Sequence, residues 1–166
     1  MNALMQKNQN TQHADSDLLQ LVIFQLGDEE FGVDIMAVQE IIKMPAITAI
    51  PQVPEYVTGV INLRGRIIVV IDLGKKFNIL SSEKNEEYKV IVVELGDQVI
   101  GMMVDSVSEV LRIPGTSVDP APDIIASAVS SNYIQGVGKL DDRLLILLDL
   151  RNVLSEHETK ELYQYV

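Results

Sequence analysis

The chain contains no cysteine and only two histidines, and both scarcities restrict its chemistry. Without cysteine, disulfide bonds and thiol chemistry are excluded, and nothing in the composition indicates an oxidising compartment. His13 lies in the N-terminal tail and His157 near the C-terminus, and neither has a spacing to other histidines or to acidic residues that is typical of metal ligands. We therefore expect no metal site and no cofactor.

Long apolar runs and an excess of basic charge are also lacking. The longest purely apolar runs, such as 67–71 and 144–148, are too short to span a bilayer, and the polar stretch 1–17 has no apolar segment of signal-peptide length. The 24 Asp and Glu residues exceed the 13 Lys and Arg residues, which gives a net charge of −11. A chain this acidic is unsuited to nucleic acid or to an anionic membrane surface. These absences predict a soluble cytoplasmic protein that binds no nucleic acid and does not insert into a membrane.

Nucleotide-binding and hydrolase motifs are absent as well. The chain has no GxxxxGK[ST] loop, no GxGxxG fingerprint and no GxSxG elbow. Asp72 and Asp149 occupy equivalent places in a repeat, as the paired acids of aspartic proteases do, but neither is followed by the hydroxyl residue that such sites place after the acid. The other interpretation is that each Asp ends a strand and caps the following helical turn. A small hydrolase with an Asp72/Asp149 pair is therefore the alternative to a non-catalytic protein.

The chain does contain an internal repeat. Residues 56–73 align with 133–150 at a constant offset of 77, and seven of the 18 positions are identical. Upstream, residues 26–45 align with 95–114 at an offset of 69, again with seven identities. A duplicated unit predicts two similar subdomains related by a pseudo-twofold axis, with the groove between them as the natural binding place. Each repeat alone, at roughly 70 residues, would be marginal as a domain, so we expect the two to fold as one unit.

Short strands separated by turn signals dominate both repeats. The expected strands are 19–26, 30–35, 57–63, 66–72, 89–95, 99–104, 106–113, 134–140 and 143–149. Residues 34–43 fit both helical and strand spacing, and their β-branched residues favour a strand. We also expect a disordered tail at 1–17, repeat units at about 19–80 and 88–150, a helical turn at 73–77, and a C-terminal helix and tail at 151–166. About ten short strands predict a mainly all-β protein built from two small β-barrels.

The equivalent hairpins of the two repeats differ in charge at their tips. Arg64-Gly65 in the first repeat becomes Asp141-Asp142 in the second. Free drift on a solvated surface is one explanation, and specialisation for different partners is the other. Gly59 lies inside a strand pattern, where glycine indicates a bulge, the approach of a partner backbone, or close packing between the two halves.

At these residues the chain resembles the CheW family of bacterial chemotaxis coupling proteins. The stretches that carry the resemblance are FQLGDEEFGVDIMAVQEII (24–42), YVTGVINLRGRIIVVIDL (56–73), IGMMVDSVSEVL (100–111), and GVGKL with RLLILLDL in the second repeat. They cover roughly residues 18–157, and the GVINLRGRII…DL run is quite specific to the family. The same fold occurs in the regulatory domain of the kinase CheA and in the first domain of CheV. We expect neither here, because the sequence has no kinase ATP-binding region and too little chain after Leu150 for a receiver domain.

The resemblance implies two pseudo-symmetric, five-stranded SH3-like β-barrel subdomains packed together, with short helices and a C-terminal helix. It implies no catalytic activity and no small-molecule ligand. It also implies an adaptor that couples chemoreceptors (methyl-accepting chemotaxis proteins) to the histidine kinase CheA, in the cytoplasm and recruited to membrane-associated receptor arrays.

Two kinds of contact follow from the resemblance. The cytoplasmic tip of the receptor docks against a groove between the subdomains, and the regulatory domain of the kinase packs end to end on the coupling protein. The implied receptor contacts are Val38, Glu40, Ile41, Gly59, Asn62 and Arg64. The implied kinase contacts lie on the second repeat, at Gly101, Met102, Val104, Gln135 and Val137.

Overall fold

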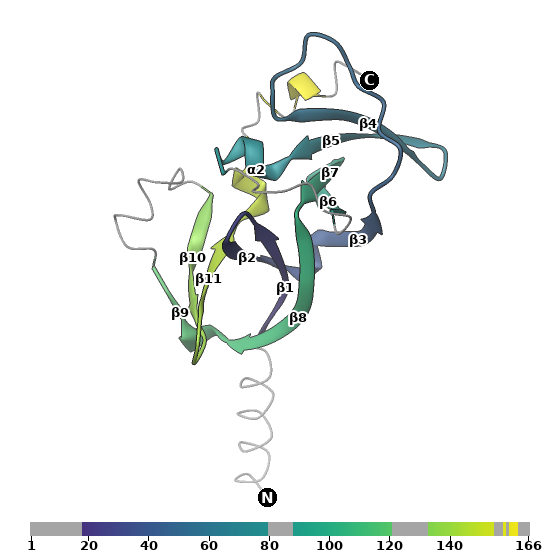
Figure 1. Ribbon diagram of the computed structural model, residues 1–166. Coiled ribbons are helices and arrows are strands. Elements are labelled where there is room, and N and C mark those ends of the chain that lie inside the picture. Colours follow the sequence, from purple (N-terminus) through teal and green to yellow (C-terminus); the bar gives the residue numbers. More distant parts are fainter. Residues whose placement is uncertain (1–17, 80–87, 121–132, 155–157, 159, 163–166) are drawn as a thin grey trace, which may run out of the picture.

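The computed structural model describes residues 18–79, 88–120, 133–154, 158 and 160–162. Within these residues, eleven strands form two sheets (Figure 1). The strands are β1 (Leu18–Leu26), β2 (Glu29–Asp34), β3 (Val38–Lys43), β4 (Val57–Leu63), β5 (Arg66–Asp72), β6 (Lys89–Leu95), β7 (Gln98–Val104), β8 (Ser106–Pro114), β9 (Val118–Asp119), β10 (Ile134–Lys139) and β11 (Leu144–Leu148). The predicted, mainly all-β fold is confirmed, and β4, β5 and β6 have the predicted bounds. The tail at 1–17 lies outside the described residues.

Each sheet combines strands from both repeats. Sheet A has the order β8-β1-β2-β11-β10-β9, and sheet B has the order β3-β6-β7-β5-β4. The hairpin β1–β2 of the first repeat lies between β8 and β11 of the second, while the hairpin β6–β7 of the second lies between β3 and β5 of the first. The junctions β2–β11 and β5–β7 are parallel. The repeats have thus exchanged their first hairpins, so neither sheet is complete without both repeats. Sheet A also has a sixth strand, the two-residue β9.

Burial on both faces of the strands explains their continuous apolar runs. Successive side chains of a strand point to opposite faces. In β5, Ile68 and Val70 enter a cluster that belongs to sheet B, whereas Val69 and Ile71 enter a larger cluster shared by both sheets. The same alternation occurs in β1 and β6. The largest hydrophobic core therefore lies between the sheets and joins them.

A row of aromatic rings crosses this shared core. The ring of Phe31 in β2 lies 6.2 Å from that of Phe77, and the ring of Phe77 lies 5.2 Å from that of Tyr133. Phe77 follows the last strand of the first repeat, and Tyr133 precedes β10 of sheet A. Aromatic side chains from β2, from the end of α2 and from the residue before β10 therefore contact one another in the shared core.

Helical structure is short in the described residues. The segment 34–43, whose spacing fits both a helix and a strand, forms a 3₁₀ turn, η1 (Ile35–Ala37), followed by β3. The preference for a strand is therefore confirmed from Val38 onward. The predicted helical turn is α2 (Leu73–Lys76). The expected C-terminal helix starts as a 3₁₀ turn, η3 (Leu150–Asn152), and residues 158 and 160–162 are helical. None of the helices in the described ranges has the length and apolar character needed to cross a bilayer.

Candidate functional site

Asp72 and Asp149 each cap a helical turn. The Asp72 carboxylate accepts a hydrogen bond from the backbone N–H of Lys75 at 3.1 Å, and Asp149 accepts one from Arg151 at 3.1 Å. Both residues have extended backbone dihedrals at the N-cap position, which is the usual geometry of a capping carboxylate. The capping interpretation is therefore confirmed. Asp72 is the last residue of β5 in sheet B, and Asp149 directly follows β11 in sheet A.

Two of the expected receptor contacts bind each other. The guanidinium of Arg64 donates to both carboxylate oxygens of Glu40, at 3.0 and 2.7 Å. The Arg64 side chain is nevertheless 78% exposed, and that of Glu40 is 25% exposed. An ion pair this exposed contributes only about 0–1 kcal/mol to stability. Its effect is to orient a guanidinium at the protein surface. Ile41, the next residue of the edge strand β3, is also exposed, and its side chain points to the other face of the strand. We call Glu40, Ile41 and Arg64 the sheet B surface.

The turn that presents Arg64 has a demanding backbone. Arg64 and Gly65 have φ values of 53° and 83°, so both central residues of this two-residue hairpin loop are left-handed, as in a type I′ turn. The Oδ1 atom of Asn62 accepts a hydrogen bond from the backbone N–H of Gly65 at 2.8 Å, which holds the turn closed. Asn62 therefore supports the position of Arg64.

Gly59 and Val38 lie in β4 and β3, at opposite edges of sheet B. Gly59 is buried in β4 with φ +152°, and a Cβ atom there would lie 2.2 Å from the carbonyl oxygen of Thr48. Two backbone hydrogen bonds of 2.9 Å join Thr48 to Val60 at this point. Glycine is thus required for the close approach of the segment before β4, within the first repeat rather than between the halves. Val38 is half-buried and packs against the shared core.

Most of the expected kinase contacts are in the core. Met102, Val104 and Val137 have at most 5% of their surface exposed. Gly101 is buried, and a Cβ atom there would lie 2.8 Å from Cγ1 of Val90. Gln135 is exposed and lines a cavity of about 320 Å³ between η1, the β6–β7 turn and η3. Of this set, Gln135 is the residue whose side chain a partner could reach directly.

The structure also reveals a surface that the sequence reasoning missed. Glu109 in β8 is the counterpart of Glu40 at the offset of 69, and it too is bound by an arginine, Arg143. A second carboxylate, Glu30, lies 3.5 Å from the same guanidinium. The hydrogen bond to Glu109 is the main cause that raises the pKa of the Arg143 guanidinium above its ordinary value, and the nearby negative charges of Glu30, Glu109 and Asp142 add to it.

An exposed aliphatic residue follows the glutamate of each ion pair in the sequence. Val110 and Leu144 are 53% and 60% exposed, and they are the counterparts of Ile41 and Ile67, which are 37% and 48% exposed. We call Glu109, Val110, Arg143 and Leu144 the sheet A surface. The repeat offset of 69, applied to Glu40 and Ile41, locates Glu109 and Val110. Arg143 and Leu144 are the counterparts of Arg66 and Ile67, which were not among the expected contacts, and the counterpart of Arg64 is Asp141.

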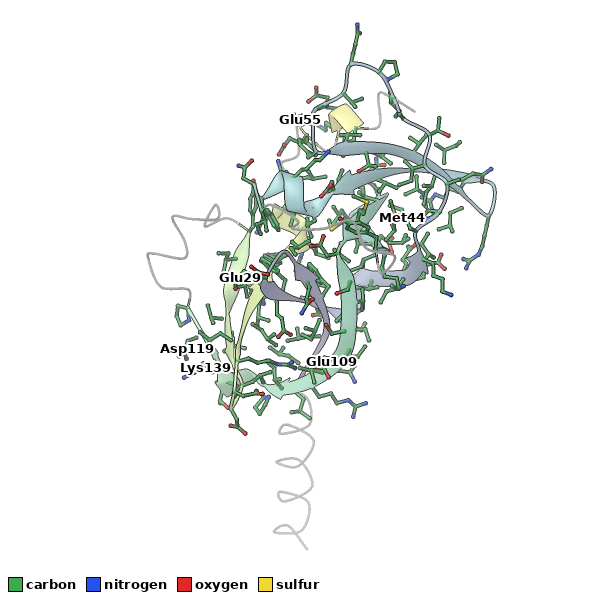
Figure 2. All side chains as sticks on the ribbon, in the orientation of Figure 1. Glu29, Met44, Glu55, Glu109, Asp119 and Lys139 are labelled. Atoms are coloured by element: carbon green, nitrogen blue, oxygen red, sulfur yellow. The ribbon has the colours of Figure 1, made fainter. Side chains whose placement is uncertain are left out.

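The two sheets differ in charge. The segments that form sheet A, residues 18–37, 105–120 and 133–152, carry ten Asp and Glu residues against four Lys and Arg residues. The segments that form sheet B, residues 38–79 and 88–104, carry five against six. Figure 2 shows Glu29, Glu109 and Asp119 around sheet A. The described part of the molecule therefore has one acidic end and one nearly neutral end.

Comparison with known proteins places this fold in a family. The model of the CheW-like domain matches residues 20–158, which is most of the chain. The chain belongs to the CheW family. It is 41% identical to the chemotaxis protein CheW of Klebsiella aerogenes over 139 residues, which cover 84% of this chain and 83% of that protein. It is 34% identical to CheW of Helicobacter pylori over 145 residues, or 87% of each protein.

A solved CheW structure has the same fold. The scaffolding protein TtCheW of Thermoanaerobacter tengcongensis matches with a TM-score of 0.76 and 38% identity, over 81% of this chain and 91% of that one. CheW proteins are chemotaxis scaffolds and adaptors rather than enzymes. In this CheW-family chain, the capping roles of Asp72 and Asp149 agree with that class, and the hydrolase alternative gains no support from their geometry.

Proposed function

We propose that this CheW-family protein is a non-catalytic adaptor that couples chemoreceptors to a CheA-type histidine kinase, in the cytoplasm at membrane-associated receptor arrays. The observation that carries the proposal is the presence of two equivalent surfaces on one body. Each has a glutamate–arginine pair and exposed aliphatic residues, but they lie on sheets of different net charge. Two related surfaces with different electrostatics suit two different partners, because charge complementarity selects the partner more than it adds affinity.

The sheet B surface is assigned to the receptor tip. Arg64 is a mostly exposed cation held in a fixed orientation by Glu40, and Ile41 supplies exposed apolar area on the same edge strand as Glu40. A helical hairpin that presents an acidic residue next to an apolar stripe would match both features. In this proposal Val38, Gly59 and Asn62 act indirectly, through core packing, the approach of the Thr48 segment and the Arg64 turn.

The sheet A surface is assigned to the regulatory domain of the kinase. Val110 and Leu144 supply the apolar area, and Gln135 adds a polar contact at the cavity that it lines. Val137 acts through the packing of β10 in sheet A. Gly101, Met102 and Val104 lie in β7 of sheet B, so in this proposal they act indirectly, through the interior of the protein. Exposed aliphatic groups are common at protein surfaces, but their recurrence at equivalent positions of both repeats favours a shared use.

One matched pair of variants tests the assignment. Ile41→Glu and Val110→Glu each place a charge at equivalent positions of the two repeats. We expect Ile41→Glu to weaken binding of a receptor cytoplasmic fragment by roughly tenfold, or about 1.4 kcal/mol, and to leave binding of the kinase regulatory domain unchanged. Val110→Glu should do the reverse. Calorimetric titration of the full chain against each partner measures both affinities. Wild-type protein that binds neither partner would refute the adaptor function, and equal losses in both variants would refute the division between surfaces.

A further inference from the structure

The two repeats differ at one position near the C-terminal residues, where the first repeat has a lysine. Lys76, the last residue of α2, is the counterpart of Val153 at the offset of 77. Val153 is fully buried in the shared core, whereas the charged side chain of Lys76 is only 10% exposed. Lysine is almost never buried to this degree without a partner. The first repeat therefore holds a charged group where the second holds an apolar one.

The partners of Lys76 are Glu158 and Tyr56. Nζ of Lys76 lies 2.5 Å from Oε2 of Glu158 and 4.6 Å from the centroid of the Tyr56 ring. The Tyr56 hydroxyl donates to the same Glu158 oxygen at 3.1 Å. A charge-assisted hydrogen bond and a cation–π contact therefore act on one ammonium group. We call Tyr56, Lys76 and Glu158 the clamp.

The clamp joins the chain leaving one sheet to the end of the other. Lys76 lies in α2, which directly follows β5 of sheet B, and the backbone oxygen of Tyr56 accepts a 2.6 Å hydrogen bond from Asp72 at the end of β5. Glu158 comes after β11 of sheet A and η3. Leu154 and Leu162, on either side of Glu158, are buried in the shared core. Figure 1 shows this helical piece, in yellow, beside β4 of sheet B.

Such a clamp contributes orientation more than net stability. Removing water from the two charges offsets most of their attraction, and an apolar contact like that of Val153 would hold the chain as well. A charge pair tolerates less movement than an apolar contact does. If the C-terminal residues shifted along sheet B, a poorly hydrated ammonium would lose its acceptor, and that loss is costly. The pair therefore permits one arrangement where an apolar contact would permit several.

We propose that Tyr56, Lys76 and Glu158 are positioning residues that fix the angle between the two sheets, and thereby the placement of the sheet B surface relative to the sheet A surface. The inference rests on the proposed adaptor function, because it assigns the clamp to the coupling of two partners. The clamp belongs to neither surface, so its loss should leave each separate binding reaction intact.

The test compares Lys76→Met and Glu158→Gln with a matched control, Lys75→Met, which removes the exposed lysine next to Lys76. Because the chain has no cysteine, Lys43→Cys on β3 and Asp141→Cys in the β10–β11 turn give two unique labelling sites, one for each sheet. Electron-spin measurements on the full chain then report the distance between these two sites, and that distance changes when the angle between the sheets changes. Titrations against each partner, and kinase activity with receptor, kinase and the full chain together, report binding and coupling.

We expect both clamp variants to broaden the distance distribution, to retain both separate affinities within about twofold, and to lower receptor-dependent kinase activity by roughly fivefold, a size typical of coupling between two sites. The exchanged pair Lys76→Glu with Glu158→Lys should restore a narrow distribution, and it keeps the test decisive if a single variant folds poorly. Distributions and activities equal to those of Lys75→Met would overturn the proposal. Wild-type protein that binds neither partner would refute the adaptor function instead, while the distance distributions would still decide whether the clamp sets the angle.

Discussion

The sheet B and sheet A surfaces contain equivalent glutamates, but the arginines that pair with them come from different positions of the repeat. Glu40 in β3 pairs with Arg64 in the β4–β5 turn, whereas Glu109 in β8 pairs with Arg143, which immediately precedes β11. The side chain of Arg64 is 78% exposed and that of Arg143 is 33% exposed. The two repeats therefore share a glutamate and the aliphatic residue that follows it, but they differ in how exposed the paired guanidinium is. On sheet B the guanidinium is bound by one carboxylate and is mostly exposed, and on sheet A it lies between two carboxylates and is mostly covered.

The largest expected difference between the repeats concerns their equivalent glycines. Gly59→Ala should destabilise the protein by about 3 kcal/mol, because its positive φ is strained for alanine and the new Cβ would meet the backbone of Thr48. Gly136→Ala should cost less, about 1–2 kcal/mol, because a Cβ there meets the Asp119 backbone oxygen at 2.8 Å without a positive φ. Chemical denaturation measures both values. Equal losses would mean that the strained backbone of Gly59 has no energetic consequence.

The next comparison reverses the charge at the sheet B tip. Arg64→Glu should weaken receptor binding by roughly tenfold, about 1.4 kcal/mol, because it places a carboxylate where an acidic partner is expected. Folding stability should change by no more than about 0.5 kcal/mol, since the side chain is mostly exposed. Titration with a receptor fragment and thermal unfolding measure the two effects.

A double variant separates direct contact from internal pairing. Glu40→Arg with Arg64→Glu restores an ion pair in the opposite direction. If the receptor contacts Arg64 itself, binding stays weak in the double variant. Full recovery of affinity would show that the pair, and not the exposed cation, is what the receptor requires.

The two arginines should also differ in what they contribute to stability. Arg143→Met should lower the unfolding midpoint more than Arg64→Met, because it leaves Glu30 and Glu109 close together without a counter-charge. Differential scanning calorimetry of the two variants gives the ranking. The opposite ranking would show that occupancy by two carboxylates does not make Arg143 the more structural residue.

The smallest expected effect dissociates stability from binding at one position. Arg64→Asn creates an Asn-Gly pair, which is favoured in type I′ turns, so stability should rise by about 0.5 kcal/mol. Receptor affinity should fall, since asparagine carries no charge. A variant that is both less stable and fully competent in binding would contradict the interpretation of the turn and that of the contact.

The strands were predictable because their signals are local. Tight turns such as Arg64-Gly65 and apolar runs such as 67–71 fixed the bounds of β4 and β5, and the capping roles of Asp72 and Asp149 follow from strand ends alone. Strand pairing depends on contacts distant in sequence, so the exchange of hairpins between repeats had no local signal.

The same limit explains the outcome for the candidate contacts. Met102 and Val137 lie in strands buried on both faces, where alternation no longer separates core from surface. Glu40 and Arg64 were both expected at the receptor surface, but their mutual hydrogen bonds join β3 to the β4–β5 turn, which lie on opposite edges of sheet B. The Lys76–Glu158 pair spans 82 residues of sequence and was invisible for the same reason.

The exchanged hairpins make the chain a natural pair of complementary fragments. A cut between residues 79 and 88 would give two pieces, each holding strands that both sheets need: β3, β4 and β5 of sheet B with β1 and β2 of sheet A in one piece, and the remaining strands of each sheet in the other. Neither piece could close a sheet by itself, yet together they would have every strand pairing of the intact protein. Reassembly of two separately expressed fragments would thus report on the interlocking of the repeats, and a partner pulling on either surface would load both repeats at once.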